Sequence, residues 1–218
     1  MAALVAVALS LALTVPPPGL RVCKNTACKK SGSADTLETL FFLASTSSEA
    51  NENAAKAAAA HGASSPALAA LQASFAASRV EASGCLGKCG SGPNCAATDS
   101  EELFHDVYKP KSCVALLAHV DISVPEAAQR AWLRRMYAMR AMRANKHTEA
   151  RALLTEALNE ASSLRGNAAH MLQALLELRA DVHDALGDAP KAVSDRERAA
   201  SMRAMLPEGS KEPAGAAA

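Results

Sequence analysis

Apolar and polar positions divide the 218-residue chain into two parts with different periodicity. Between residues 19 and 122, short apolar runs alternate with polar loops, which predicts short strands and helices. Residues 125–206 contain one internal proline and few β-branched residues, which predicts helices throughout. We therefore expect an α/β domain over residues 19–122, with a small sheet flanked by helices, and an all-α module over residues 123–206.

The expected elements of the first part follow from the same pattern. Strands are expected at residues 19–22, 79–82, 95–97 and 103–108, and helices at 36–44, 67–77 and 112–120. Ser33 or Asp35 is expected to cap the helix that begins at Thr36, because each side-chain oxygen can accept from a free N–H of the first turn. Residues 45–65 are rich in Ser, Ala, Asn and Glu and are interpreted as an exposed insertion.

The helical part contains two stretches, residues 145–158 and 187–200, that align at an offset of 42 positions. Each begins with a turn residue, Asn145 or Gly187, followed by alanine five and twelve positions later. The alanines are Ala150, Ala157, Ala192 and Ala199. The pattern resembles the tetratricopeptide repeat (TPR), in which small residues let paired helices pack closely, although the usual period is ~34 residues. An ordinary pair of helical hairpins is the alternative.

Composition and charge exclude some classes of function. The net charge is +1, so the chain as a whole gives no reason to expect nucleic acid as a partner. Six cysteines in a chain of this length are too few for a disulfide-rich scaffold. The tail over residues 207–218 is rich in Pro, Gly and Ala and is expected to be disordered.

The first 18 residues resemble a leader. Residues 1–15 carry no charged side chain, and three prolines follow. The run is shorter than the roughly 20 apolar residues of a spanning helix, so we expect no stable membrane span and interpret it as a signal-like targeting segment. Delivery to a plastid through a secretory-type leader is the favoured location, and a mitochondrial or cytosolic location is the alternative.

Four cysteines occur as two close pairs. Cys23 and Cys28 have four residues between them, and Cys85 and Cys89 lie in a glycine-rich stretch, residues 83–95. Glycine allows the chain to curl closely around a ligand, and thiolates are the ligands of iron–sulfur clusters. We expect the two loops to meet and hold one metal centre. Zinc, thiol exchange and a domain that has lost its cluster are the alternatives.

Two further cysteines, Cys95 and Cys113, are interpreted as small buried hydrophobic side chains. Cys95 is the better candidate for an alternative ligand, because it follows Cys89 by only six residues. His105 and His119 could replace thiolates, but four cysteines already suffice, so structural or exposed roles are expected for both.

The cysteine motifs resemble those of a known family. Cys-x4-Cys, a helix, and then Gly-Cys-Leu-Gly-x-Cys-Gly-x-Gly-Pro-Asn over residues 84–94 resemble the thioredoxin-like 2Fe–2S ferredoxins and the small iron–sulfur subunit of respiratory complex I. The resemblance covers residues 20–120. It implies a thioredoxin-like sheet, an electron-carrying cluster near the surface and often a homodimer. The cluster and metal ligands that it implies are Cys23, Cys28, Cys85 and Cys89.

Together these features predict a 2Fe–2S electron-transfer protein with a helical docking module, which is not an enzyme in its own right. A redox partner protein would dock on the cluster face or on the C-terminal helices. The alternative is a TPR-like scaffold or a redox or iron sensor, in which the cluster or a zinc ion is structural. Four lysines flank the ligands: Lys24, Lys29, Lys30 and Lys88. Their positive charge should favour reduction of an anionic cluster. The alternative is that they are solvated charges of the loops.

The first expected helix of the second part carries two features of interest. A series of large apolar side chains is expected to form its packed core face: Trp132, Leu133, Met136, Met139 and Met142. Seven basic residues between positions 130 and 151, against one acidic residue, are interpreted as solvated charge, with a docking surface for an acidic partner as the alternative.

Overall fold

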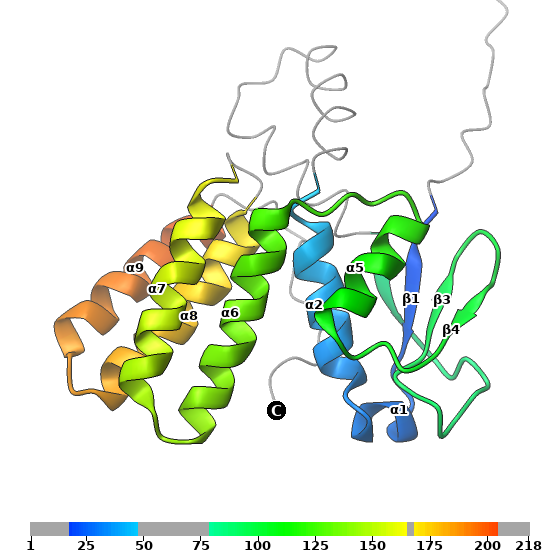
Figure 1. The fold of residues 1–218 in the computed structure, drawn as a ribbon, viewed down its shortest axis with the longest axis horizontal. Helices are drawn as coiled ribbons and strands as arrows, with labels where there is room; N and C mark the ends of the chain where they lie inside the picture. Colours follow the sequence, from blue (N-terminus) through cyan, green and yellow to red (C-terminus); the bar gives the residue numbers. More distant parts are fainter. Residues whose placement is uncertain (1–17, 48–78, 165–167, 205–218) are drawn as a thin grey trace, which may run out of the picture.

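The computed structural model describes residues 18–47, 79–164 and 168–204. The predicted leader up to residue 17, residues 48–65 of the insertion, the helix expected over 67–77 and the tail over 207–218 lie outside the described residues. In the described ranges, a small mixed sheet with neighbouring helices is followed by a helical region that makes up the C-terminal part (Figure 1). At this coarse level the predicted fold class is confirmed.

The sheet is formed by β1 (Leu20–Cys23), β2 (Val80–Ser83), β3 (Cys95–Ala97) and β4 (Leu103–Phe104), in the order β2-β1-β3-β4. β1 pairs parallel with β2 and antiparallel with β3, and β3 pairs antiparallel with β4. The predicted strand over residues 103–108 is wrong beyond Phe104. Asp106 has a positive φ of 55°, and a residue in this conformation cannot continue a strand.

Three helices accompany the sheet: α1 (Thr26–Lys30), α2 (Ser33–Ala44) and α5 (Pro110–His119). α1 lies in a region expected to be a loop; Asn25 caps it by accepting from the N–H of Ala27 at 3.3 Å. The predicted cap of α2 by Ser33 or Asp35 is wrong. Its N-cap is Gly32, at φ 93°, and Ser33 is buried in the first turn. Glycine tolerates this left-handed conformation, so α2 begins directly after α1.

The C-terminal helices are α6 (Glu126–Arg143), α7 (His147–Ser162), α8 (Ala169–Ala185) and α9 (Ala189–Ala204). Asn145 and Gly187 have positive φ values of 58° and 76° in the α6–α7 and α8–α9 turns. The four aligned alanines are all buried in the helix packing: Ala150, Ala157, Ala192 and Ala199. None of the helices in the described ranges has the length and apolar character needed to cross a bilayer.

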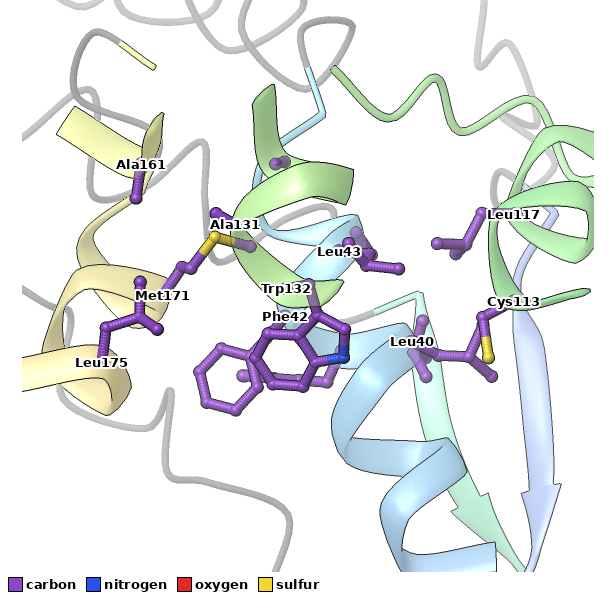
Figure 2. Close-up of a cluster of buried hydrophobic side chains, with 14 of the residues drawn as sticks. Leu40, Phe42, Leu43, Cys113, Leu117, Ala131, Trp132, Ala161, Met171 and Leu175 are labelled. Carbon is purple, nitrogen blue, oxygen red and sulfur yellow. The ribbon is translucent and has the colours of Figure 1, made fainter. Parts of the chain in front are cut away.

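The two parts of the chain share one hydrophobic core, in which α6 packs against α2 (Figure 2). Trp132 of α6 lies beside Phe42 of α2, with ring centroids 5.0 Å apart. The Trp132 indole N–H donates to the Thr39 hydroxyl at 3.1 Å, which satisfies a buried donor. Arg135 stacks on Trp132, with its guanidinium carbon 4.4 Å from the ring centroid, and pairs with Glu38 at 2.5 Å. The boundary near residue 123 stays a prediction.

The predicted core face of α6 is only partly correct. Trp132 is buried, but Leu133 and Met136 are 40% and 36% exposed. The residues that α6 does bury are mostly alanines: Ala128, Ala131, Ala138 and Ala141. These small side chains let neighbouring helices approach closely, and Leu133 and Met136 are left on the outer side.

His170 of α8 belongs to the same contact region. It is 4% exposed, its ring packs edge-on against Phe41 of α2 with centroids 5.2 Å apart, and Nε2 has no hydrogen-bond partner among the described residues. Burial lowers its pKa from 6.5 to about 4. The folded protein therefore holds His170 in the neutral form at neutral pH.

We predict that protonation of His170 destabilises the fold in mild acid. Between pH 6.5 and about 4 the unfolded chain binds a proton that the folded chain does not, so this contribution is complete above pH 6.5 and is lost as the pH falls toward 4. The expected loss is about 3 kcal/mol. Urea unfolding across this range should show a smaller pH dependence for His170→Leu than for the wild type, and equal dependences would contradict the prediction.

Candidate metal centre

The parallel pairing of β1 and β2 brings the two cysteine loops together. In the register of this pair, Cys23 lies opposite Ser83, and the N–H of Lys24 donates to the Ser83 carbonyl at 2.9 Å. Parallel strands end at the same edge of a sheet. The chain segments that leave this edge are the one that contains Cys28 and the one that contains Cys85 and Cys89.

The four predicted ligands are brought together as two neighbouring pairs. The Cys85 and Cys89 sulfurs are 3.5 Å apart. The Cys23 sulfur lies within hydrogen-bonding reach of the thiols of both Cys28 and Cys85, and so connects the pairs. Cys23 and Cys28 are buried, whereas Cys85 and Cys89 are exposed. The centre therefore has an inner pair of sulfurs and a surface pair.

Backbone N–H groups point at the sulfurs of Cys23 and Cys85, among others. Burial alone would raise the pKa of the Cys23 thiol, but hydrogen bonds from the N–H groups of Asn25 and Leu86 and from neighbouring thiols lower it on balance. The N–H of Gly87 donates to the Cys85 sulfur at 3.4 Å, and the positive φ of Gly87, 88°, lets the loop turn there. Such donors stabilise negative charge on sulfur, as thiolate ligands require.

The pKa values of the other two thiols, Cys28 and Cys89, are raised. Burial raises the pKa of Cys28, and the thiol of Cys23 raises it further. The pKa of Cys89 is raised chiefly by its hydrogen bond with Cys85 and by the charge of that neighbour. Four sulfurs this close repel one another as thiolates, so a shared cation is what would allow all four to lose their protons.

Asn94 connects the two loops, and sequence reasoning assigned it no role. Its side-chain amide donates to the Lys88 carbonyl at 2.6 Å and lies 3.7 Å from the Cys28 sulfur. Its side-chain oxygen is 2.9 Å from Nδ1 of His105, which must carry the proton and donate. Asn94 is 1% exposed. The sequence feature that could have identified Asn94 is its place at the end of the Gly-x-Gly-Pro-Asn motif. A buried side-chain amide needs several hydrogen-bond partners, so an asparagine there is expected to join neighbouring segments.

Gly92 is required where this loop passes the buried pair. A Cβ atom at this position would lie 2.8 Å from the Cys28 sulfur and 3.4 Å from the Cys28 Cα. Gly84, at the start of the same loop, has no atom within 4 Å of the corresponding Cβ position and no positive φ. The two glycines therefore have different roles: Gly92 allows close approach to sulfur, and Gly84 has space around it.

The other two cysteines are buried in the hydrophobic core. Cys95 on β3 and Cys113 on α5 are 0% and 1% exposed. Burial raises the pKa of both thiols, that of Cys113 to about 12, so both are protonated at neutral pH. Their burial agrees with the interpretation of both as small hydrophobic side chains.

In the described part of the chain, no set of three or more His, Cys, Asp or Glu side chains has the arrangement of a site for a metal ion. A single tetrahedral ion needs its ligands to converge on one point. The four sulfurs here form two pairs, one at the surface and one beneath it. His119, the other histidine considered as a ligand, instead pairs with Glu102 at 3.2 Å and packs on Phe104.

We predict that Gly92→Ala destabilises the protein while Gly84→Ala does not. The added methyl group would push against the Cys28 sulfur and displace Asn94 from it, which should lower the free energy of unfolding by about 1–3 kcal/mol. Urea unfolding and the rate of thiol labelling at Cys28 measure the effect. Equal stabilities of the two variants would show that the close approach at Gly92 is unimportant.

No family model, curated protein or solved structure matches the chain. What the four cysteines do is therefore inferred from the residues of this chain. Two sulfur pairs lie where β1 and β2 end, backbone donors point at the sulfurs, and Asn94 holds the two segments together.

Proposed function

We propose that the protein is a one-electron carrier whose 2Fe–2S cluster is held by four cysteines: Cys23, Cys28, Cys85 and Cys89. The observation that carries the proposal is that the β1–β2 register and the approach of Asn94 to the Cys28 sulfur bring together cysteines from segments 57 residues apart, from Cys28 to Cys85. When bound, such a cluster supplies reversible one-electron chemistry.

The arrangement of the sulfurs in two pairs suits a two-iron cluster, with one zinc ion as the alternative. A two-iron cluster takes two thiolates at each iron, so it needs two pairs, and the two pairs are separate in sequence and in burial. A zinc ion would need the four sulfurs to converge on one point. The N–H groups of Asn25, Leu86 and Gly87 are the donors that would tune the cluster's reduction potential.

The exposure of one pair supports a role in transfer between proteins. Cys85 and Cys89 lie at the surface, so a partner can approach their sulfurs directly, while Cys23 and Cys28 are covered by the fold. A purely structural centre has no need of an exposed edge. This difference favours a carrier over a scaffold or sensor in which the cluster is structural.

The finer fold assignments are part of the proposal. The mixed sheet, with a parallel β1–β2 pair followed by antiparallel β3 and β4, supports a thioredoxin-like domain. Positive φ at Asn145 and Gly187 and the burial of the four aligned alanines support two TPR-like helical hairpins. We propose that these hairpins serve as the docking module of the carrier.

We predict that Cys89→Ser removes the cluster chromophore and that Cys113→Ser leaves it intact. Cys89 would ligate iron from the surface, whereas Cys113 is a protonated thiol in the core. Visible absorbance and the electron paramagnetic resonance of the dithionite-reduced proteins are the measurements. A colourless wild-type protein that contains zinc would contradict the proposal, as would equal loss of colour in both variants.

We predict that Lys88→Gln makes the reduction potential more negative. Lys88 lies between Cys85 and Cys89 in the exposed loop, and removal of its positive charge should disfavour the extra electron, by roughly 10–40 mV for an exposed charge. Redox titration of the visible absorbance gives the value. Arg198→Gln on α9, on the opposite side of the molecule (Figure 1), is the control and should have no effect.

A further inference from the structure

Two separate groups of cations lie at one end of the molecule. In Figure 1, α1 and the β2–β3 loop with the exposed cysteines lie at the lower edge, and the α6–α7 turn reaches the same edge. Lys29, Lys30 and Lys88 are exposed near the cysteines, and Arg140 and Arg143 are exposed in the last turns of α6. Positive charge is therefore present on both parts of the chain at this end.

These five cations differ from most arginines of the helical part. None of the five forms a salt bridge with a described residue. By contrast, Arg130, Arg134, Arg135, Arg179 and Arg196 each pair with a carboxylate. The charge of the five cations is therefore not neutralised by any described carboxylate. Arg198 on α9 is a further exposed cation without a salt bridge to a described residue and provides a control.

An apolar strip on α6 adjoins the second group of cations. Leu133, Met136 and Tyr137 are 40%, 36% and 52% exposed and follow the i, i+3, i+4 spacing of one helix face. Arg140 continues this face by one turn. A surface hollow of about 470 Å³ lies beside Tyr137, between α6 and the start of α7. Its other lining residues are Arg140, Ala141, Ala144, Lys146, Glu149 and Leu153.

We propose that this end of the molecule is the docking face for an acidic protein partner. Carboxylates of the partner would lie against the lysines around the cysteines and against Arg140 and Arg143, and an apolar side chain of the partner would enter the hollow at Tyr137. A large apolar anchor within a charged rim is the usual anatomy of a specific interface. The proposal rests on the proposed function in one respect, because the partner covers the exposed Cys85–Cys89 edge.

The same charges favour an acidic partner over a second copy of this chain. A two-fold dimer through this face would bring two copies of the same positively charged patch together, and like charges across an interface cost binding free energy. An acidic partner gains attraction at every one of these positions, and long-range attraction would speed its approach to the cysteine edge.

Binding of two labelled peptides tests the docking face. Both are oligoglutamates of equal length, and one carries a central tryptophan; fluorescence anisotropy at low ionic strength measures their Kd values with the full-length protein. The double variants Lys29→Glu/Lys30→Glu and Arg140→Glu/Arg143→Glu should each raise Kd about tenfold. Tyr137→Ala should remove the preference for the tryptophan peptide, and Arg198→Glu should leave both Kd values unchanged.

The outcomes separate this proposal from the proposed function. Absence of binding to the wild type, unchanged binding in both double variants, or an equal loss in Arg198→Glu would overturn the docking face, whatever the iron content. If the wild-type protein lacks iron and yet shows the expected pattern of binding, the docking face stands and the electron-carrier proposal fails. Circular dichroism of each variant checks that the fold is retained.

Discussion

The parallel pairing of β1 with β2 is the constraint on which the candidate site depends. It places Cys23 opposite Ser83, two residues before Cys85, so that both cysteine segments leave the sheet at one edge. A shift of the register by one residue would turn the Cys23 side chain to the other face of the sheet. The contact between Asn94 and the Cys28 sulfur, and the space that Gly92 leaves for it, then fix the approach of the second loop to the first.

The helix α2 links the sulfur site to the helical part. It begins at Ser33, three residues after α1 ends, and its other side packs on α6 through Phe42 and Trp132. The Thr39 hydroxyl and the Glu38 carboxylate satisfy polar groups of α6 within this contact. Packing around the buried Trp132 therefore holds α6 in a fixed position relative to the cysteines. A partner could then contact both parts of the chain at once.

Local sequence patterns predicted most of the described elements, because alternation and helical spacing reflect burial directly. The four strand positions, the two cysteine pairs and the aligned small residues of α7 and α9 were predictable. The short helix α1, the Gly32 cap and the early end of β4 were not, since each depends on backbone conformation at single residues. The roles of Asn94 and Gly92 depend on contacts between distant segments. The exposure of Leu133 and Met136 depends on which face of α6 the neighbouring helices cover, and sequence spacing alone does not determine it.

The four gathered sulfurs are central to the proposed function, and the most direct test is the content of iron and acid-labile sulfide in the anaerobically purified or reconstituted chain. The result that we predict is two irons and two sulfides per chain, with all four of the gathered cysteines blocked from thiol reagents. One zinc ion without sulfide, or four freely reactive thiols after reconstitution, would contradict it.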